Sequence, residues 1–275
     1  MSGRGATVEL RNVSKVYAGG TAALTDLSLM VPAGSICAIV GPSGCGKTTA
    51  LKVVNRLVGP TEGSILIDGR DVTAVDAVTL RRGIGYVIQQ VGLFPHRTVE
   101  QNISTVPELL GWPRARIRTR VAGLLELIGL EARYASRYPS ELSGGERQRV
   151  GVARALAAEP PVMLMDEPFA AVDPIARAQL QDDLLRIHER IGMTVLFVTH
   201  DIDEALKMGD RIAVLRSGRL VQYATPRELL VHPADDLVRD LLGIERWLGR
   251  LDALADAGVL SAGEVLARMR DRGAG

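Results

Sequence analysis

Residues 41–48 read GPSGCGKT and fit the pattern G-x-x-x-x-G-K-[ST]. An apolar run, SICAIV at 35–40, precedes the pattern and predicts a buried strand, while residues 47–58 predict a helix. This strand–loop–helix unit constrains the fold more than any other stretch of the chain. Ligands of parallel α/β sheets lie beyond the carboxyl ends of the strands, where such a loop would be. The alternative is a glycine-rich turn that merely caps a helix.

The residue types in this loop suit phosphate binding. Gly41, Gly44 and Gly46 let the backbone curl until successive N–H groups point at phosphate oxygens, and the positive end of the following helix adds to the same place. We expect Lys47 to reach the β- and γ-phosphates and the Thr48 hydroxyl to ligate Mg²⁺. Only four of the 33 basic residues are Lys, so Lys47 marks a position that prefers an ammonium to a guanidinium. The other predicted nucleotide contacts of the loop are Ser43, Cys45 and Thr49.

Three further polar residues follow predicted buried strands. Asp166 ends the run VMLMD, where a carboxylate is the expected Mg²⁺ partner of a phosphate loop. Glu167 comes next and, as a second carboxylate that does not bind metal, is suited to orient or deprotonate an attacking water. The strand TVLFVT delivers His200 to the same edge, where a neutral imidazole would hold the γ-phosphate or the water. The alternatives are an ordinary acidic turn before Pro168 and a histidine without a role.

Strand patterns alternate with helical patterns along the chain. The predicted strands cover 7–17 (an edge strand), 35–40, 64–69, 83–90, 162–167, 194–200, 211–218 and 219–224, with a hairpin turn at Ser217-Gly218. The predicted helices cover 47–58, 114–129, 146–158 and 175–191. This alternation predicts a mostly parallel sheet with helices on both faces. Residues 91–154 hold no convincing strand and predict a helical insert in an α/β core.

Composition narrows the classes of protein. A net charge of +1 argues against a dedicated nucleic-acid binder, which usually carries a strong basic excess. No apolar stretch approaches the roughly 18–20 residues of a membrane-spanning helix, and the N-terminus lacks the apolar middle of a secretory signal. We therefore expect a soluble, cytoplasmic chain whose membrane contact goes through partners. Cys37 and Cys45 form no disulfide framework, and we expect both to be reduced.

Taken in order, the motifs resemble those of the ATP-binding subunit of an ABC transporter, over about residues 7–240. Tyr17 matches the aromatic residue that stacks on adenine, and Gln89 matches the loop glutamine that touches Mg²⁺ and links to the helical subdomain. LSGGERQR at 142–149 matches the family signature, and Asp173 lies in the dimer-crossing loop. VMLMDE matches the second phosphate-site strand, and VTHD with His200 matches the histidine switch.

The resemblance implies a P-loop NTPase fold in the α/β class. Its parts would be a RecA-like core with a mainly parallel sheet, an antiparallel β subdomain and an inserted helical subdomain. The expected domains are an ATPase domain at 1–240, with its core at 1–90 and 155–240 and its helical subdomain at 91–154, and a helical tail at 241–275. In that tail, apolar residues from Ile244 to Ala255 share one helical face, and Ser261-x-x-Glu264 predicts a capping box before a second helix.

The resemblance also implies a homodimer that sandwiches two ATP molecules. Ser143, Gly144 and Gly145 would cap the γ-phosphate held by the other copy's loop, and the positive end of the helix that starts near Glu146 would face that anion. Glu146 stands where Gln is common, and near a phosphate it must point away. Ala170 and Val172 replace the usual Gly and Leu, which we expect to tune activity rather than abolish it.

Within the family, VPELLGW at 106–112 and its surroundings look most like importers of quaternary amines: glycine betaine, carnitine or choline. The implied partners are transmembrane permease subunits at the cytoplasmic face of the membrane and, indirectly, an extracytoplasmic solute-binding protein, with no nucleic acid. Nothing in such an ATPase contacts the solute, so substrate identity depends on resemblance alone. The alternatives are an importer ATPase for an amino acid or another small solute, an ABC ATPase acting on nucleic acid or ribosomes, and a P-loop kinase.

Overall fold

The computed structural model describes residues 5–89, 92–170 and 172–243. The chain divides into two compact units, residues 1–226 and 227–275. In its described part the second unit holds α9 (Asp236–Leu242) and all but the first residue of α8 (Pro226–Val231). β10, the last strand among the described residues, ends at Ala224, and the expected domain boundary at 240 lies within the second unit. The predicted tail helices lie outside the described residues.

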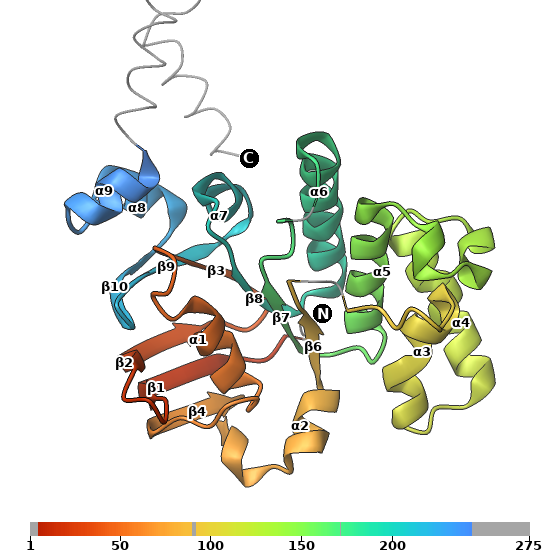
Figure 1. The fold of residues 1–275 in the computed structure, drawn as a ribbon, viewed down its shortest axis with the longest axis horizontal. Coiled ribbons are helices and arrows are strands. Elements are labelled where there is room, and N and C mark those ends of the chain that lie inside the picture. Colours follow the sequence, from red (N-terminus) through yellow and green to blue (C-terminus); the bar gives the residue numbers. More distant parts are fainter. Residues whose placement is uncertain (1–4, 90–91, 171, 244–275) are drawn as a thin grey trace, which may run out of the picture. The chain divides into compact units, whose positions relative to one another are not determined.

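Six strands of the first unit form the larger sheet, in the order β10-β9-β3-β8-β7-β6 (Figure 1). Neighbours from β9 to β6 pair in parallel, and β10 pairs antiparallel with β9. The bounds are β3 (Ile36–Val40), β6 (Ile84–Val87), β7 (Val162–Asp166), β8 (Thr194–Val198), β9 (Arg211–Arg216) and β10 (Arg219–Ala224). Ser217 and Gly218 turn the β9–β10 hairpin with φ of 47° and 77°, which confirms the predicted turn.

Four strands form a second, antiparallel sheet in the order β2-β1-β4-β5. They are β1 (Val8–Val16), β2 (Ala22–Val31), β4 (Glu62–Ile67) and β5 (Arg70–Asp71). The prediction that residues 7–17 form an edge strand is wrong, because β2 and β4 pair with the two sides of β1. The missed strand β2 carries a readable signal, since its buried side chains recur along AALTDLSLMV at Leu24, Leu27, Leu29 and Val31.

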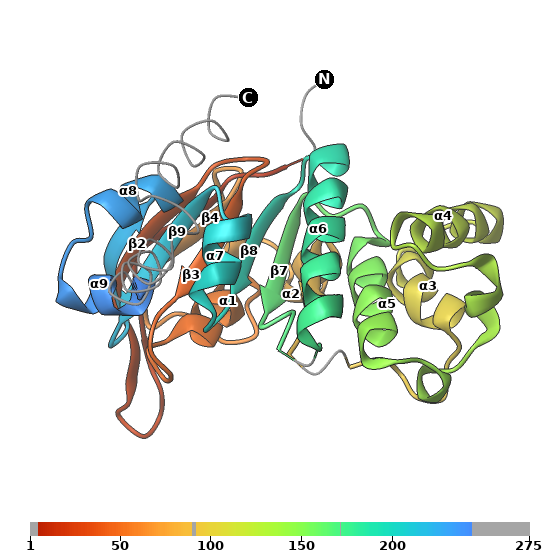
Figure 2. The same cartoon turned by 90° about the horizontal axis from the view of Figure 1, so that it is seen from above.

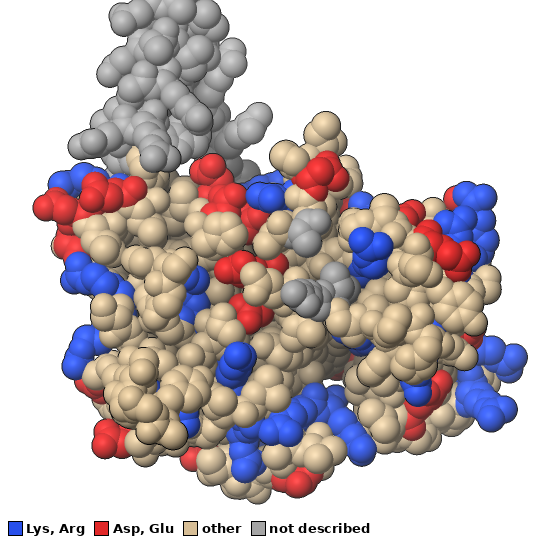
Figure 3. Space-filling view, in the orientation of Figure 1, with Lys and Arg blue, Asp and Glu red and all other residues tan. Residues whose placement is uncertain are grey.

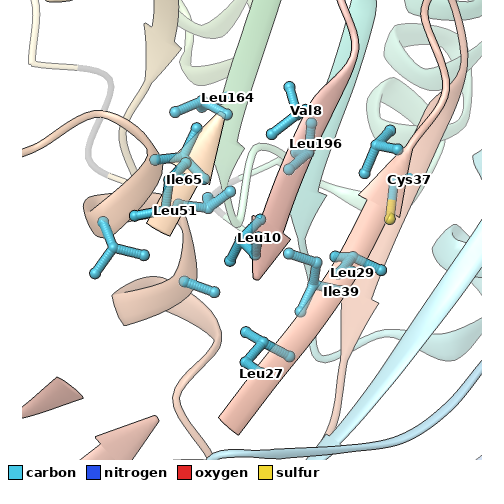
Figure 4. Close-up of a cluster of buried hydrophobic side chains, with 14 of the residues drawn as sticks. Val8, Leu10, Leu27, Leu29, Cys37, Ile39, Leu51, Ile65, Leu164 and Leu196 are labelled. Atoms are coloured by element: carbon cyan, nitrogen blue, oxygen red, sulfur yellow. The ribbon is translucent and has the colours of Figure 1, made fainter. Parts of the chain in front are cut away.

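The main core lies between these two sheets. Figure 4 shows Val8 and Leu10 of β1 gathered with Ile39 of β3 and Leu51 of the first helix. Alternate residues of the central strands face opposite sides, so Cys37 and Ile39 enter this core. Ala38 faces the other side of the sheet, toward Gly209 at the end of the helix Ile202–Met208. A Cβ added to Gly209 would lie 3.4 Å from the Ala38 Cβ. Burial on both faces explains why β3, β7 and β8 are continuous apolar runs.

Helices cover both faces of the larger sheet. Helix α1 (Lys47–Val54) contributes Leu51 and Val53 to the core between the sheets. On the other face, α6 (Pro174–Ile191) and α7 (Ile202–Met208) contact each other, and Figure 2 shows them along one side of the strands. The short elements are α2 (Ala77–Arg82) and the 3₁₀ turns Val72–Ala74, Ala132–Ser136 and Pro139–Glu141.

The helical insert predicted for residues 91–154 is present, and its described residues, 92–154, contain no strand. It comprises α3 (Val99–Leu109), α4 (Arg114–Leu127) and α5 (Gly144–Leu156), grouped beside α6 in Figure 1. A capping box of Thr98 and Gln101 starts α3. Within the described ranges, no helix is long and apolar enough to cross a membrane.

Candidate functional site

The phosphate loop at residues 41–48 joins β3 to α1, as predicted. Gly46 occupies the N-cap of α1 with φ 105°, so the helix begins at Lys47. Two loop glycines are enclosed by backbone. A Cβ on Gly41 would lie 2.1 Å from the Leu215 carbonyl oxygen, and one on Gly46 would lie 2.3 Å from the Ala23 carbonyl oxygen. The loop is therefore held tightly on both sides, and its glycines are required by space as well as by backbone angles.

A cavity of about 220 Å³ lies against the loop. Its lining includes the predicted residues Ser43, Gly44, Gly46, Lys47, Thr48, Thr49 and Glu167, together with Ala23. Lys47 is only 7% exposed, and its ammonium donates to the carbonyls of Gly41 and Pro42 at 2.8 and 3.0 Å. These bonds hold the lysine along the loop, where a phosphate on the N–H groups would be within its reach.

Cys45, like Gly41 and Pro42 of the same loop, does not line the cavity. Its side chain is buried against the position of a Gly41 Cβ, at 2.8 Å, and its carbonyl accepts from Gly218 N–H at 3.0 Å. Burial raises the pKa of the Cys45 thiol. Cys37 and Cys45 are both free thiols, as predicted. Cys45 thus contributes to the loop through its backbone and its packing.

Thr48 and Asp166 meet at the carboxyl end of β7. Asp166 is the last residue of β7, and its Oδ1 accepts from the Thr48 hydroxyl at 3.0 Å. Burial raises the pKa of the Asp166 carboxyl, and the hydrogen bond from Thr48 opposes that shift. Two hard oxygen donors beside a phosphate loop form a ligand set of the kind that Mg²⁺ prefers.

Glu167 connects the remaining predicted catalytic residues. It follows β7 with φ 47°, a conformation uncommon for a non-glycine residue, and its N–H donates to Val198 O at 2.9 Å. Its Oε2 accepts from Gln89 Nε2 at 2.8 Å, and its Oε1 lies 3.5 Å from His200 Nδ1. Residues from the ends of β6, β7 and β8 therefore converge on one carboxylate, because these strands are parallel neighbours.

Tyr17 lies next to the loop, as the nucleotide-stacking prediction requires. Its hydroxyl is 3.4 Å from Thr49 Oγ1, and the Lys15 ammonium lies 5.3 Å from the centre of its ring. The side chain is partly exposed. The hydroxyl end of the Tyr17 ring thus contacts the phosphate loop, while part of the ring surface is exposed to solvent.

The signature turn, residues 143–145, is built as a helix start. Ser143 is the N-cap of α5, so the helix begins at Gly144 rather than at Glu146. The Ser143 hydroxyl accepts from Glu146 N–H at 3.2 Å, and the Glu146 carboxylate accepts from Ser143 N–H at 2.6 Å. This hydrogen bond holds the pKa of Glu146 below its usual value. The S-x-x-E spacing of this capping box is a readable sequence signal, although the box was not predicted.

The residues predicted to act on the nucleotide of a second copy lie at the starts of α5 and α6. Residues 143–145 and Asp173 are absent from the lining of the cavity beside the phosphate loop in the described part of the chain. Asp173 is the N-cap of α6 and accepts from Ala176 N–H at 3.0 Å. Val172 beside it is buried, and Ala170 is exposed.

Sequence reasoning also missed a polar cluster next to His200. Arg177 lies 3.5 Å from Asp201 Oδ2 and 3.9 Å from Glu204 Oε1, and it donates to Val172 O at 3.2 Å. The only local signal is Asp201, an acidic residue at a helix N-cap. Arg177 is distant in sequence, so spacing alone does not reveal the cluster.

The fold and the loop together define a P-loop NTPase. Residues 24–170 match the family described as ABC transporter. The ATP-binding cassette MJ0796, solved as a dimer in a post-hydrolysis state bound to ADP and Pi, is similar at 37% identity and a TM-score of 0.72, over 80% of this chain and 99% of that one. The chain belongs to the ABC transporter family, and the resemblance seen in its motifs is confirmed.

Two curated relatives are each 52% identical to this chain. One is the osmoprotectant import ATP-binding protein OsmV of Salmonella typhimurium, matched over 94% of this chain and 67% of that protein. The other is the glycine betaine/carnitine/choline transport ATP-binding protein OpuCA of Bacillus subtilis, matched over 88% of this chain and 63% of that protein. The chain thus spans about two thirds of the length of these relatives.

Proposed function

We propose that this chain binds and hydrolyses ATP as the energising subunit of an ABC importer. The observation that carries the proposal is the convergence of Gln89, Glu167 and His200 beside the Thr48–Asp166 pair and the phosphate loop. In this proposal the cavity beside the loop holds the phosphates, and Tyr17 stacks on the adenine.

Mg²⁺ would be held by Thr48, Asp166 and Gln89, together with phosphate oxygens. When bound, the ion would neutralise charge on the phosphates. The loop N–H groups and the Lys47 ammonium would bind and orient the same phosphates. Asp166 suits this role, because burial leaves its carboxyl short of water and a nearby cation would favour its ionised form.

Glu167 would orient and deprotonate the attacking water. The Gln89 amide donates to one of its oxygens and His200 faces the other, so the carboxylate has a defined direction. A positioned base of this kind typically contributes a factor of about 10²–10⁴ to the rate. His200 would hold the γ-phosphate or the water from the opposite side.

We further propose that ATP is sandwiched between two copies of the chain. Ser143, Gly144 and Gly145, with Asp173 nearby, would complete the cavity of the partner copy. The start of α5 supports this arrangement, because Ser143, its N-cap, is exposed and the positive end of the helix lies at residues 143–145. The similar cassette solved as a dimer is consistent with it.

The transported solute would be a compatible solute such as glycine betaine, carnitine or choline. The names of the similar OsmV and OpuCA support this choice. Permease subunits would hold the chain at the cytoplasmic face of the membrane, and an extracytoplasmic solute-binding protein would act through them. An importer of an amino acid or another small solute is the alternative, because residues that contact the solute lie in the partner proteins.

The test of the ATPase proposal is Glu167→Gln, with Glu126→Gln on the exposed face of α4 as the matched control. We expect Glu167→Gln to keep ATP binding within about twofold, to lose hydrolysis by about 100-fold or more, and to accumulate as an ATP-bound dimer in size-exclusion chromatography. The control variant should behave as the parent chain does. Hydrolysis by Glu167→Gln at the parental rate would show that this carboxylate is not the base.

The solute is tested by uptake in cells that lack their own betaine, carnitine and choline importers. The chain is expressed with the permease and solute-binding protein encoded nearest to its gene, and uptake of each radiolabelled solute is measured. We expect uptake of at least one methylammonium solute, which Glu167→Gln abolishes. Uptake of an amino acid instead, with no methylammonium solute taken up, would favour the alternative.

A further inference from the structure

We propose that Arg177 is a positioning residue that fixes the turn carrying His200 to the loop before α6. The proposal rests on the proposed ATP hydrolysis and adds to it a residue outside the motifs. Arg177 would act through His200 and would touch neither nucleotide nor water.

Arg177 is tied to the loop before α6 by backbone and side chain. Its N–H donates to Asp173 O at 2.8 Å within the first turn of the helix. Its Nη2 donates to the carbonyl of Val172 at 3.2 Å. The guanidinium is therefore held at the start of α6, beside Val172 and Asp173.

The other terminal nitrogen of the same guanidinium faces the start of α7. Nη1 lies 3.5 Å from Asp201 Oδ2 and 3.9 Å from Glu204 Oε1. Asp201 also caps α7, because its Oδ1 accepts from Asp203 N–H at 2.9 Å. One planar group thus joins a carbonyl of the loop before α6 to two carboxylates at the start of α7, an arrangement that suits a guanidinium fork and not a single ammonium.

The two neighbours of His200 are both fixed by this cluster. The Thr199 hydroxyl donates to Glu204 Oε2 at 2.6 Å, and Asp201 N–H donates to Thr199 Oγ1 at 3.0 Å. His200 itself is 63% exposed, and its Nδ1 faces Glu167 Oε1. The direction of the imidazole therefore depends on a turn whose flanking residues are held by the carboxylates that Arg177 faces.

Charge makes Arg177 necessary for this arrangement. Glu204 is only 5% exposed and lies close to Asp201. Without the guanidinium, two carboxylates would remain side by side, one of them buried without its cation, which is strongly unfavourable. We expect the turn to shift in response, and a displacement of about 1 Å at a catalytic group is enough to lower a rate by up to about 100-fold.

The first experiment measures kcat, KM for ATP and ATP affinity for Arg177→Met and Arg177→Lys. Arg190→Met, at an exposed position of the same helix, is the matched control. We expect Arg177→Met to lower kcat by about tenfold or more while KM and ATP affinity stay within about twofold. Arg177→Lys should be intermediate, because it restores the charge but not the fork, and Arg190→Met should match the parent chain. An unchanged kcat in Arg177→Met would overturn the proposal.

A double variant tests whether Arg177 acts through His200. If it does, adding Arg177→Met to His200→Ala lowers the residual single-turnover rate no further. Losses that multiply would show that Arg177 affects hydrolysis by another route and would overturn the proposal.

A readout without activity separates this proposal from the proposed function. The chain has four histidines, so the imidazole resonances can be assigned by NMR. We expect Arg177→Met to shift the His200 resonance and Arg190→Met to leave it in place. A chain that hydrolyses no ATP but shows this shift would contradict the proposed ATPase and support the positioning role. An unmoved His200 resonance would contradict the positioning role even in an active enzyme.

Discussion

Substitution of loop glycines by alanine should separate backbone strain from steric exclusion. Gly41 and Gly44 both have positive φ, of 147° and 77°. A Cβ on Gly41 would lie 2.1 Å from the Leu215 carbonyl oxygen, whereas one on Gly44 would meet nothing within 4 Å. Gly123, in the interior of α4, also faces open space and has ordinary helical backbone. The same chemical change is thus made in three different environments.

The expected effects on the free energy of unfolding differ in sign and size. Gly123→Ala should stabilise the chain by about 0.5–1 kcal/mol, because glycine is unfavourable inside a helix. Gly44→Ala should destabilise by about 1 kcal/mol, the cost of a left-handed alanine partly offset by a stiffer unfolded chain. Gly41→Ala should cost more, because two effects act together. Backbone strain costs about 1–3 kcal/mol, and the backbone must also shift by about 1 Å against β9, which costs about a further 1–3 kcal/mol, as overpacked cores do.

Thermal melting by circular dichroism measures the order. For a chain of this size about 1 kcal/mol corresponds to about 2–4 °C in Tm. We therefore expect Gly123→Ala to melt slightly above the parent, Gly44→Ala about 2–4 °C below it and Gly41→Ala about 4–24 °C below it. If Gly41→Ala and Gly44→Ala melt at the same temperature, the Leu215 carbonyl of β9 does not exclude a side chain at position 41, which would contradict the steric account.

Three further predictions concern α5 and its neighbour α6. Ser143→Arg should spare ATP binding to the monomer but block ATP-dependent dimers in sedimentation; normal dimers would contradict capping by a second copy. The lowered pKa of Glu146 means that its contribution to stability is full above the unfolded value near 4.5 and is lost as pH falls through the lower folded value. The stability difference between the parent and Glu146→Gln in urea should therefore shrink below about pH 4.5 and stay constant above it. Asp183→Asn should cost about 2 kcal/mol in urea unfolding, because its carboxylate bonds Arg149 at 2.6 Å where both side chains are mostly buried; a loss below about 0.5 kcal/mol would contradict this.

The parts of the site predicted from the sequence are those with a strong local signal. The phosphate loop has a fixed spacing, a buried strand before it and a helix after it, and the structure has all three. Asp166 and His200 were found because each ends or follows a wholly buried run, and such runs occur where helices cover both faces of a sheet. Strand order was not readable in the same way. It places β8 and β7 between β3 and β6, and this order is what brings Gln89 to Glu167.

The failures have physical reasons of two kinds. Strand β2 was missed although its buried leucines recur along the strand, and this error turned β1 into an edge strand. That signal was present in the sequence. The contacts of Arg177 were a different case, because the guanidinium meets Asp201 across 24 residues of sequence through the packing of α6 on α7. No periodicity or cap encodes such a contact, so it becomes visible only when the helices are placed.

The capping box at the signature turn bears on how an acidic residue can lie beside a phosphate site. Glu146 N–H and Ser143 N–H are both used inside the box, and Arg147 N–H donates to Ser143 O at 2.9 Å. By helix geometry, the N–H groups of Gly144 and Gly145 have no partner in the preceding turn. The Ser143 hydroxyl accepts within the box and keeps its own hydrogen to donate. The donors left for an incoming anion are therefore the Ser143 hydroxyl and the N–H groups of Gly144 and Gly145. These are the three residues that we propose face the γ-phosphate of a second copy, and Glu146 orders the turn without using any of these donors.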